Sequence, residues 1–250
     1  MDWQSGKIKL YTEAGLALLL VLTLAVAGAT GVLSPREEKE TVSVSEAEFQ
    51  SEGNEATEKD PKQISQEAEE TIADGQYPIM GESAVTVKEM VDYFNSSGKL
   101  YPSAELSEGG ADSIEAFCQM YYEEAEAEGV RPEVAFAQTM KETGFLQYGG
   151  DASIEQFNFA GLGTTGNGVP GNSYPDVRTG IRAQIQHLKA YATTDALVQE
   201  CVDDRYEYVK KGAAPYVEWL GQQENPEGLG WATGDNYGYD IVEMIEDMTS

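Results

Sequence analysis

The sequence has few groups that titrate near neutral pH and little positive charge. It contains one histidine and two cysteines among 250 residues, and their spacing fits neither a Cys/His zinc site nor a Cys–His catalytic pair. Sixteen Lys and Arg residues stand against forty-four Asp and Glu residues, so the formal net charge is −28. A field of this sign repels phosphate backbones. We therefore expect no metal site and no nucleic-acid partner. Cys118 and Cys201 either form one disulfide in an exported protein or remain buried free thiols.

Alternation of apolar and polar residues with a period of two, which is typical of half-buried strands, is almost absent. Apolar residues instead recur at helical spacing. The stretches with this spacing are 85–98, 111–130, 131–144 and 177–192, with two shorter ones at 214–221 and 237–248. A long irregular segment runs from Phe145 to Asp176, and a loop of that length in a compact domain is usually functional. The fold is predicted to be mainly helical.

The helix ends are indicated by residues that favour them. Asp112 or Ser113 is expected to cap the second helix at its start, and Gly129 to stop it. Pro132 is expected at the first position of the third helix, which ends at Gly144.

The N-terminal region contains an uncharged run from Ala14 to Ser34. At about 1.5 Å per residue, such a run spans the roughly 30 Å hydrocarbon core of a bilayer. A signal peptide cleaved after Ala27 or Ala29 is one interpretation, and an uncleaved anchor is the other. A cleavable apolar region is typically about 7 to 15 residues long, so the length favours the anchor. Residues 1–34 are therefore expected to be a membrane anchor or signal segment.

Residues 35–80 are rich in Glu, Ser, Gln and Lys and poor in aromatic residues. Such a segment buries too little apolar surface to offset the entropy of ordering. We expect a disordered acidic linker over 35–80 and a single folded domain over 81–250.

Glu142 is an acid at the end of an apolar helical stretch, directly before Thr143 and Gly144. The negative end of the helix dipole and partial burial beside Phe145 both disfavour a carboxylate, so we expect a raised pKa. A carboxyl group that stays protonated near neutral pH suits a general acid for a glycosidic oxygen. From the residues alone, an exposed glutamate at a fraying helix end is the simpler interpretation.

Four stretches resemble one known family in the same order along the chain. They are "EVAFAQTMKETGF", "FNFAGLG", "VRTGIRAQIQHLKAYA" and "GWATGDNYGYDIVEMI". They are similar to the bacterial glucosaminidases, the endo-β-N-acetylglucosaminidases of glycoside hydrolase family 73, which cleave peptidoglycan. The resemblance runs from about Ser113 to Met248. It implies a helix-rich, α+β lysozyme-like catalytic domain with a groove for a glycan strand, and no metal or organic cofactor.

The resemblance also implies roles for single residues. Glu142 matches the catalytic acid of the family, and Asn158 and Gly161 match a loop that lines the groove. Relatives commonly have tyrosine where this chain has Trp231, and that tyrosine has been assigned a part in catalysis. An indole donates one hydrogen bond but supplies no phenol. Trp231 is therefore expected to stack on a sugar, and Tyr237 is a possible substitute for the phenol.

The second catalytic group stays open. Glu155, just before Asn158, is the first candidate for a second carboxylate, and Asp176 and Asp235 are others. A third route needs no second carboxylate, because the 2-acetamido oxygen of the substrate attacks the anomeric carbon.

These observations predict a peptidoglycan hydrolase that cleaves the β-1,4 bond after N-acetylglucosamine. Its expected partners are glycan strands and, through the N-terminal helix, the membrane. We expect a single-pass protein with an extracytoplasmic domain, or a secreted one if the segment is cleaved. A lytic transglycosylase and an inactive peptidoglycan-binding or assembly protein are the alternatives, and Trp231 is the feature that favours the inactive one.

Overall fold

A computed structural model describes residues 76–149, 152–164, 168 and 170–250. The expected membrane segment and nearly all of the expected linker lie outside the described residues. Within them, no helix has both the length and the apolar character needed to cross a bilayer. Pairing of the β type in this part consists of three isolated bridges. The prediction of a mainly helical domain is confirmed, whereas its likeness to lysozyme stays a prediction.

Helices account for most of the ordered secondary structure in the described part. The α-helices are α1 (Val87–Ser96), α2 (Ser103–Glu108), α3 (Ile114–Glu128), α4 (Pro132–Thr143), α5 (Val177–Ala192) and α6 (Tyr237–Met248). Short 3₁₀ turns lie between the later helices: η2 (Ile154–Gln156) before α5, and η3 (Tyr206–Tyr208) and η4 (Val217–Leu220) before α6. The stretch at 214–221 is thus a 3₁₀ turn and not an α-helix. The sequence did not predict α2.

The helix boundaries follow from the residues at their ends. Ser113 caps α3, since its hydroxyl oxygen accepts a hydrogen bond from the backbone N–H of Ala116 at 3.2 Å. Gly129 ends the helix with φ of 73°, a left-handed conformation that glycine adopts without steric cost. Pro132 lies at the start of α4, where a backbone N–H is not needed. Asp176 caps α5.

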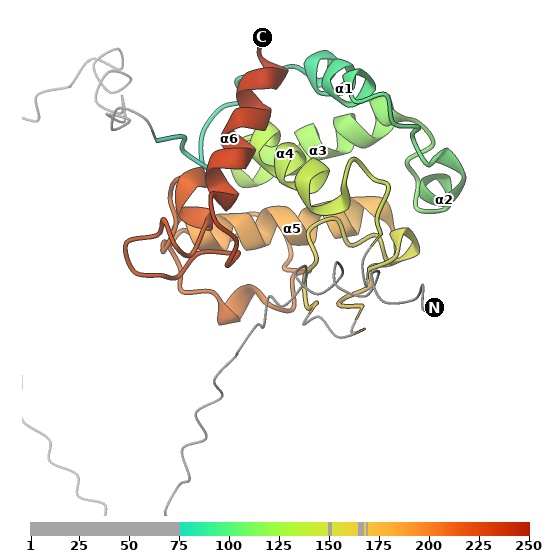
Figure 1. Cartoon of the computed structure of the whole chain (residues 1–250). Coiled ribbons are helices and arrows are strands. Elements are labelled where there is room, and N and C mark those ends of the chain that lie inside the picture. Colours follow the sequence, from blue (N-terminus) through green and yellow to red (C-terminus); the bar gives the residue numbers. More distant parts are fainter. Residues whose placement is uncertain (1–75, 150–151, 165–167, 169) are drawn as a thin grey trace, which may run out of the picture. The chain divides into compact units, whose positions relative to one another are not determined.

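Helix α5 lies at the centre of the described domain. Figure 1 shows it crossing beneath α3 and α4, with α6 beside α4. Helix α3 packs against α5, α4 and α1, and α6 packs against α4 and η4. Nearly the whole of α5 is buried, including polar side chains such as Gln184, Gln186 and Lys189. Each of these three has hydrogen-bond partners inside the protein, as burial of a polar group requires.

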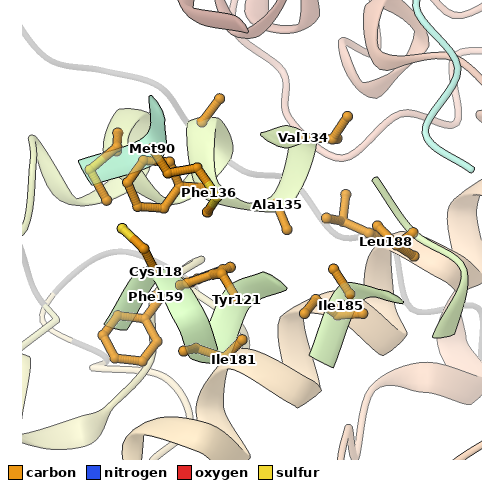
Figure 2. Packing of buried hydrophobic residues seen from close by; sticks show 14 of the residues in the cluster. Met90, Cys118, Tyr121, Val134, Ala135, Phe136, Phe159, Ile181, Ile185 and Leu188 are labelled. Carbon is orange, nitrogen blue, oxygen red and sulfur yellow. The ribbon is translucent and has the colours of Figure 1, made fainter. Parts of the chain in front are cut away.

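The core is formed by apolar side chains of α1, α3, α4, α5 and α6. Figure 2 shows Met90, Tyr121, Phe136 and Ile181 turned toward one another. All four residues are 0 % exposed. Phe159, from the irregular segment, packs edge-on against this cluster (Figure 2). The packing therefore ties the long irregular segment to the helices.

The chain enters the domain through residues 77–85, which we call the strap. Ile79 is fully buried, its N–H donates to Pro215 at 3.0 Å, and its carbonyl accepts from Arg131 at 2.9 Å. The buried carboxylate of Glu133 accepts from the hydroxyl of Tyr77 at 2.7 Å. The sequence places the start of the domain at residue 81, and the structure packs residues 77–80 against it as well.

Candidate active site

Glu142 lies in the last turn of α4, and Tyr237, the first residue of α6, lies against it. The hydroxyl group of Tyr237 donates a hydrogen bond to Oε1 of Glu142. The two helices pack directly on each other, so the contact joins residues that are 95 positions apart in the sequence. It brings together two residues that the sequence had singled out separately.

Opposing influences act on the pKa of Glu142. Burial among protein atoms is the largest, and it raises the pKa, because an ionised carboxylate loses hydration there. The hydrogen bond from Tyr237 and the positive charge of Lys141 lower the pKa, but they do not cancel the effect of burial. As a residue, Glu142 is still exposed. Solvent therefore reaches the side chain on one side, and packed protein surrounds the carboxyl group on the other.

Tyr237 is held as a neutral hydrogen-bond donor. It is 6 % exposed, and its oxygen accepts a hydrogen bond from Nε2 of Gln138 at 3.0 Å. Burial, and then the negative charge of Glu142, raise the pKa of Tyr237 well above its usual value. The phenol consequently keeps its proton and donates it to the hydrogen bond with Glu142.

Lys141 borders this pair from the neighbouring position on α4. Its ammonium group lies 5.5 Å from the centre of the Tyr237 ring. It also forms an ion pair with Asp240 on α6, with 2.7 Å between Nζ and Oδ2. The pairing holds the positive charge close to the carboxyl group and links α4 to α6 a second time.

The chain leaves α4 through a strained turn. Gly144 has φ of 58°, and Phe145, Leu146 and Tyr148 have φ of 59°, 62° and 54°. The left-handed conformation costs about 1–2 kcal/mol for each non-glycine residue. Two hydrogen bonds to Thr143 hold the turn, from Leu146 N at 2.9 Å to the hydroxyl oxygen and from Tyr148 N at 2.8 Å to the carbonyl. Backbone strain of this kind is common at functional sites, and here it begins at Phe145, three residues after Glu142.

Asn158 organises the loop on which it lies. It is 1 % exposed, and its side-chain amide bonds to the backbone of Leu162 and, at 3.1 Å, to the carbonyl of Asn172. Gly161, in the turn between, has φ of 63° and is partly buried. The side chain of Asn158 is thus used within the protein. Direct contacts of Asn158 and Gly161 with a glycan stay predictions.

The three candidates for a second carboxylate lie at separate places. Glu155 is exposed in η2, Asp176 is used as the N-cap of α5, and Asp235 is exposed in the loop before α6. In the described part of the chain, none of them forms a hydrogen bond with Glu142.

Trp231 belongs to an aromatic cluster on the Tyr237 side of the site. Its ring is perpendicular to that of His187, with centroids 4.8 Å apart, and lies 5.7 Å from that of Tyr191. Tyr191 also raises the pKa of Tyr237, after burial and Glu142, so the cluster reaches toward the acid. His187, the single histidine of the sequence, is buried, and its Nδ1 is hydrogen-bonded to Oδ2 of Asp203 at 2.6 Å.

Gln138 is a site residue that sequence reasoning missed. It sits in the apolar stretch of α4 and is fully buried, yet its amide contacts the Tyr237 hydroxyl. A polar residue inside an otherwise apolar helix face is the signal in the sequence, because a buried amide requires partners.

Within the described residues, no group of three or more His, Cys, Asp or Glu side chains is placed to hold a metal ion. Both cysteines are free thiols. Cys118 is buried in α3 as expected, whereas the expectation of burial is wrong for Cys201, which is exposed.

Known proteins resemble parts of this chain. An uncharacterized protein of Borreliella burgdorferi is 41% identical over 104 residues, which cover 42% of this chain and 51% of that protein. The chain thus spans about half the length of this curated relative. No solved structure matches the chain significantly. Residues 118–250 match the Glucosaminidase family, described as mannosyl-glycoprotein endo-beta-N-acetylglucosaminidase. Because that match spans more than half of the sequence and includes both Glu142 and Tyr237, the chain belongs to the Glucosaminidase family, a membership that implies a glycoside hydrolase.

Proposed function

We propose that the chain hydrolyses the β-1,4 bond after N-acetylglucosamine in peptidoglycan, with Glu142 as the general acid. Family membership supports a hydrolase of the peptidoglycan type. The observation that carries the assignment of the acid is the contact between Glu142 and Tyr237, at a carboxyl group whose pKa is raised by burial.

The contacts of Glu142 support both stages of acid catalysis. Before the reaction, burial raises the pKa of the carboxyl group and so favours its protonated form, which has a proton to give to the leaving oxygen. After the transfer, the new carboxylate accepts a hydrogen bond from Tyr237 and lies near the charge of Lys141. The same two groups therefore stabilise the form of the acid that the reaction creates.

Two routes remain for the second catalytic group. In one, a second carboxylate acts at about 5–5.5 Å from the acid for retention or about 6.5–9.5 Å for inversion, with Glu155 as the first candidate and Asp176 and Asp235 as the others. In the other, the 2-acetamido oxygen of the substrate attacks the anomeric carbon, and no second acid is needed. The changes Glu155→Gln, Asp176→Asn and Asp235→Asn separate the routes, because one of them lowers activity by orders of magnitude only in the first.

The phenol of Tyr237 favours an active enzyme over an inactive glycan-binding protein. Trp231 stands where relatives have tyrosine, and this was the feature that suggested lost activity. Tyr237 supplies a phenol that contacts the acid directly. In the proposal Trp231, which is half-buried beside Tyr191, offers its remaining surface to a sugar ring.

The proposed location follows from the chemistry and from the N-terminal sequence. Peptidoglycan lies outside the cytoplasm, and residues 1–34 have the length and composition of a membrane anchor. We place the folded domain on the outer side of the membrane, or in the medium if the segment is cleaved.

The test is a digest of purified peptidoglycan with the purified chain, read by reduction of new chain ends and mass spectrometry. We expect reduced N-acetylglucosamine ends from the natural chain and none from Glu142→Gln. Glu115→Gln, an exposed glutamate in the first turn of α3, is the matched control and should digest normally. Anhydro-muramic ends would instead identify a lytic transglycosylase, and glycan binding without new ends would identify a binding protein.

A further inference from the structure

A line of buried polar side chains connects the centre of the domain to Glu142. Gln184 of α5 and Gln138 of α4 are both 0 % exposed, and Tyr237 of α6 is 6 % exposed. Each is hydrogen-bonded to the next, and the last is bonded to Glu142. We call Gln184, Gln138 and Tyr237 the relay.

The orientation of the first amide is set by a backbone carbonyl. The oxygen of Ala135 accepts and never donates, so Gln184 must turn its Nε2 toward it, at 2.9 Å. The opposite end of the amide, Oε1, accepts from the hydroxyl groups of Tyr121 at 2.7 Å and Thr139 at 2.9 Å. A flipped Gln184 would set its oxygen against the carbonyl oxygen of Ala135, with no hydrogen between the two acceptors.

This orientation passes from one side chain to the next. Nε2 of Gln184 has a second hydrogen, which it donates to Oε1 of Gln138 at 2.9 Å. Gln138 therefore presents its own Nε2 to the hydroxyl oxygen of Tyr237, at 3.0 Å. Since that oxygen accepts from Gln138, the single hydroxyl hydrogen of Tyr237 is directed to Oε1 of Glu142.

We propose that the relay selects which oxygen of Glu142 carries the acidic proton. Oε1 is already the acceptor for Tyr237, so the proton of the neutral acid resides on Oε2. Among the described residues Oε2 has no hydrogen-bond partner, which leaves it available to the glycosidic oxygen. Gln138 and Gln184 are then positioning residues that act through Tyr237. The inference rests on the proposed function and deepens it.

The other ionisable groups near Glu142 and Tyr237 do not change the direction of the hydrogen bond between these two residues. Lys141 acts on Glu142 from α4, and its ammonium group is paired with Asp240 of α6. Tyr191 of α5 faces Tyr237 and acts on it as a phenol. An ammonium group only donates, and its charge acts on either carboxylate oxygen, so it does not decide between Oε1 and Oε2.

Loss of Gln138 should allow the last hydrogen bond to reverse. In Gln138→Met the oxygen of Tyr237 loses its donor, and a protonated Glu142 gains the option of donating to it from Oε1. The reversed hydrogen bond is open only to the neutral acid, so it stabilises the neutral form and raises the pKa of Glu142. It also turns the proton toward Tyr237 and away from the glycan. We expect kcat to fall about tenfold. This is only part of the rate enhancement of about 10²–10⁴-fold that a positioned general acid supplies.

The experiment measures the pKa of Glu142 in the full chain by ¹³C NMR of labelled glutamate carboxyls. The resonance is assigned by its loss in Glu142→Gln, and peptidoglycan digestion is followed in parallel. The matched control is Gln186→Met. Gln186 is also fully buried on α5 and its amide makes three hydrogen bonds, to Glu200, Val202 and Asp203, but it lies outside the relay.

A second variant breaks the relay one step earlier. In Gln184→Met the amide of Gln138 is free to flip, so the pKa of Glu142 should rise again. If Gln184→Met acts on Glu142 only through Gln138, adding it to Gln138→Met causes no further rise in the pKa of Glu142. The two pKa shifts are then not additive. This variant also tests the relay if Gln138→Met does not fold.

The outcomes separate the two proposals. A raised pKa in Gln138→Met and Gln184→Met, absent in Gln186→Met and not additive in the double variant, supports the relay. An unchanged pKa in the two relay variants, or an equal shift in Gln186→Met, overturns it. If the pKa rises as expected while the natural chain releases no glycan ends, the relay stands and the proposed function fails.

Discussion

The hydroxyl group of Tyr237 donates a hydrogen bond to Oε1 of Glu142. Glu142 lies in the last turn of α4 and Tyr237 is the first residue of α6, so the bond depends on how closely these helices approach. Gly238, the second residue of α6, lets this helix pack closely on η4, because a Cβ atom at this position would lie 2.1 Å from the carbonyl oxygen of Val217. The site is therefore a product of helix packing more than of any one loop.

Replacement of Tyr237 by phenylalanine should change the pH dependence of the reaction. The donated hydrogen bond stabilises the carboxylate of Glu142, so its loss raises the pKa of Glu142 further. A general acid works in its protonated form, and activity falls as pH rises through its pKa. The fall in kcat/KM should therefore move to higher pH in Tyr237→Phe, while the maximum decreases about tenfold or more.

The matched control for this change lies two residues away. Tyr239→Phe removes a hydroxyl from the same helix, but Tyr239 is 52 % exposed. Its pH profile should equal that of the natural chain. An unshifted profile in Tyr237→Phe would contradict the role given to the phenol.

Trp231 should contribute to glycan binding and not to proton transfer. In Trp231→Leu we expect KM to rise several-fold, since stacking of an aromatic ring is worth about 1 kcal/mol beyond its buried area. The high-pH fall in kcat/KM should stay where it is, because Glu142 and Tyr237 are unchanged. Steady-state digestion of soluble glycan fragments measures both quantities. Trp231→Tyr introduces the residue that is common in relatives. Its KM for glycan should be closer to that of the natural chain than the KM of Trp231→Leu is.

The turn after Glu142 should depend on a glycine at position 144. A Cβ atom there would meet no atom within 4 Å, so the cost of Gly144→Ala is conformational only. With φ of 58°, that cost is about 1–2 kcal/mol of unfolding free energy. Urea denaturation measures it. Gly234→Ala is the control, since a Cβ there also meets no atom and its φ is not left-handed, and it should leave stability within about 0.5 kcal/mol.

The strap should make a measurable contribution to stability through Glu133. This fully buried carboxylate accepts hydrogen bonds from the hydroxyls of Tyr77 and Ser83 and from the N–H of Ala84. Glu133→Gln preserves the shape but turns one acceptor into a donor. We expect the unfolding free energy to fall by about 1–3 kcal/mol. An equal loss in the exposed control Glu115→Gln would argue against this explanation.

Much of the fold could be predicted because local residues specify it. Ser113 and Gly129 mark the two ends of α3, and both act as expected. In contrast α2 is only six residues long, and its N-cap position is occupied by Pro102, which makes no side-chain hydrogen bond there. A helix of that length is too short to show the periodicity on which the prediction relies.

The site could be predicted only in part, because its geometry depends on contacts between distant residues. Glu142 is identified by its resemblance to a family motif and by its place at a helix end. Its contact with Tyr237 spans 95 positions and depends on the packing of two helices, which spacing along the chain does not reveal. The place of Gln184 in the hydrogen-bonded line to Glu142 could not be predicted for a related reason. Helix α5 was expected to bury one apolar face, and in fact almost its whole circumference is buried.

The strap also determines how a mechanical load would enter the domain. Tension on the chain ahead of Tyr77 is borne first by backbone hydrogen bonds of residues 77–81 to Gly129, Arg131, Pro215 and Val217. Two of these partners precede α4, and the other two lead into η4, which packs against α6. A pull from the N-terminal side is thus divided between the segments that precede α4 and those that pack against α6, and such a pull would strain Glu142 and Tyr237 together.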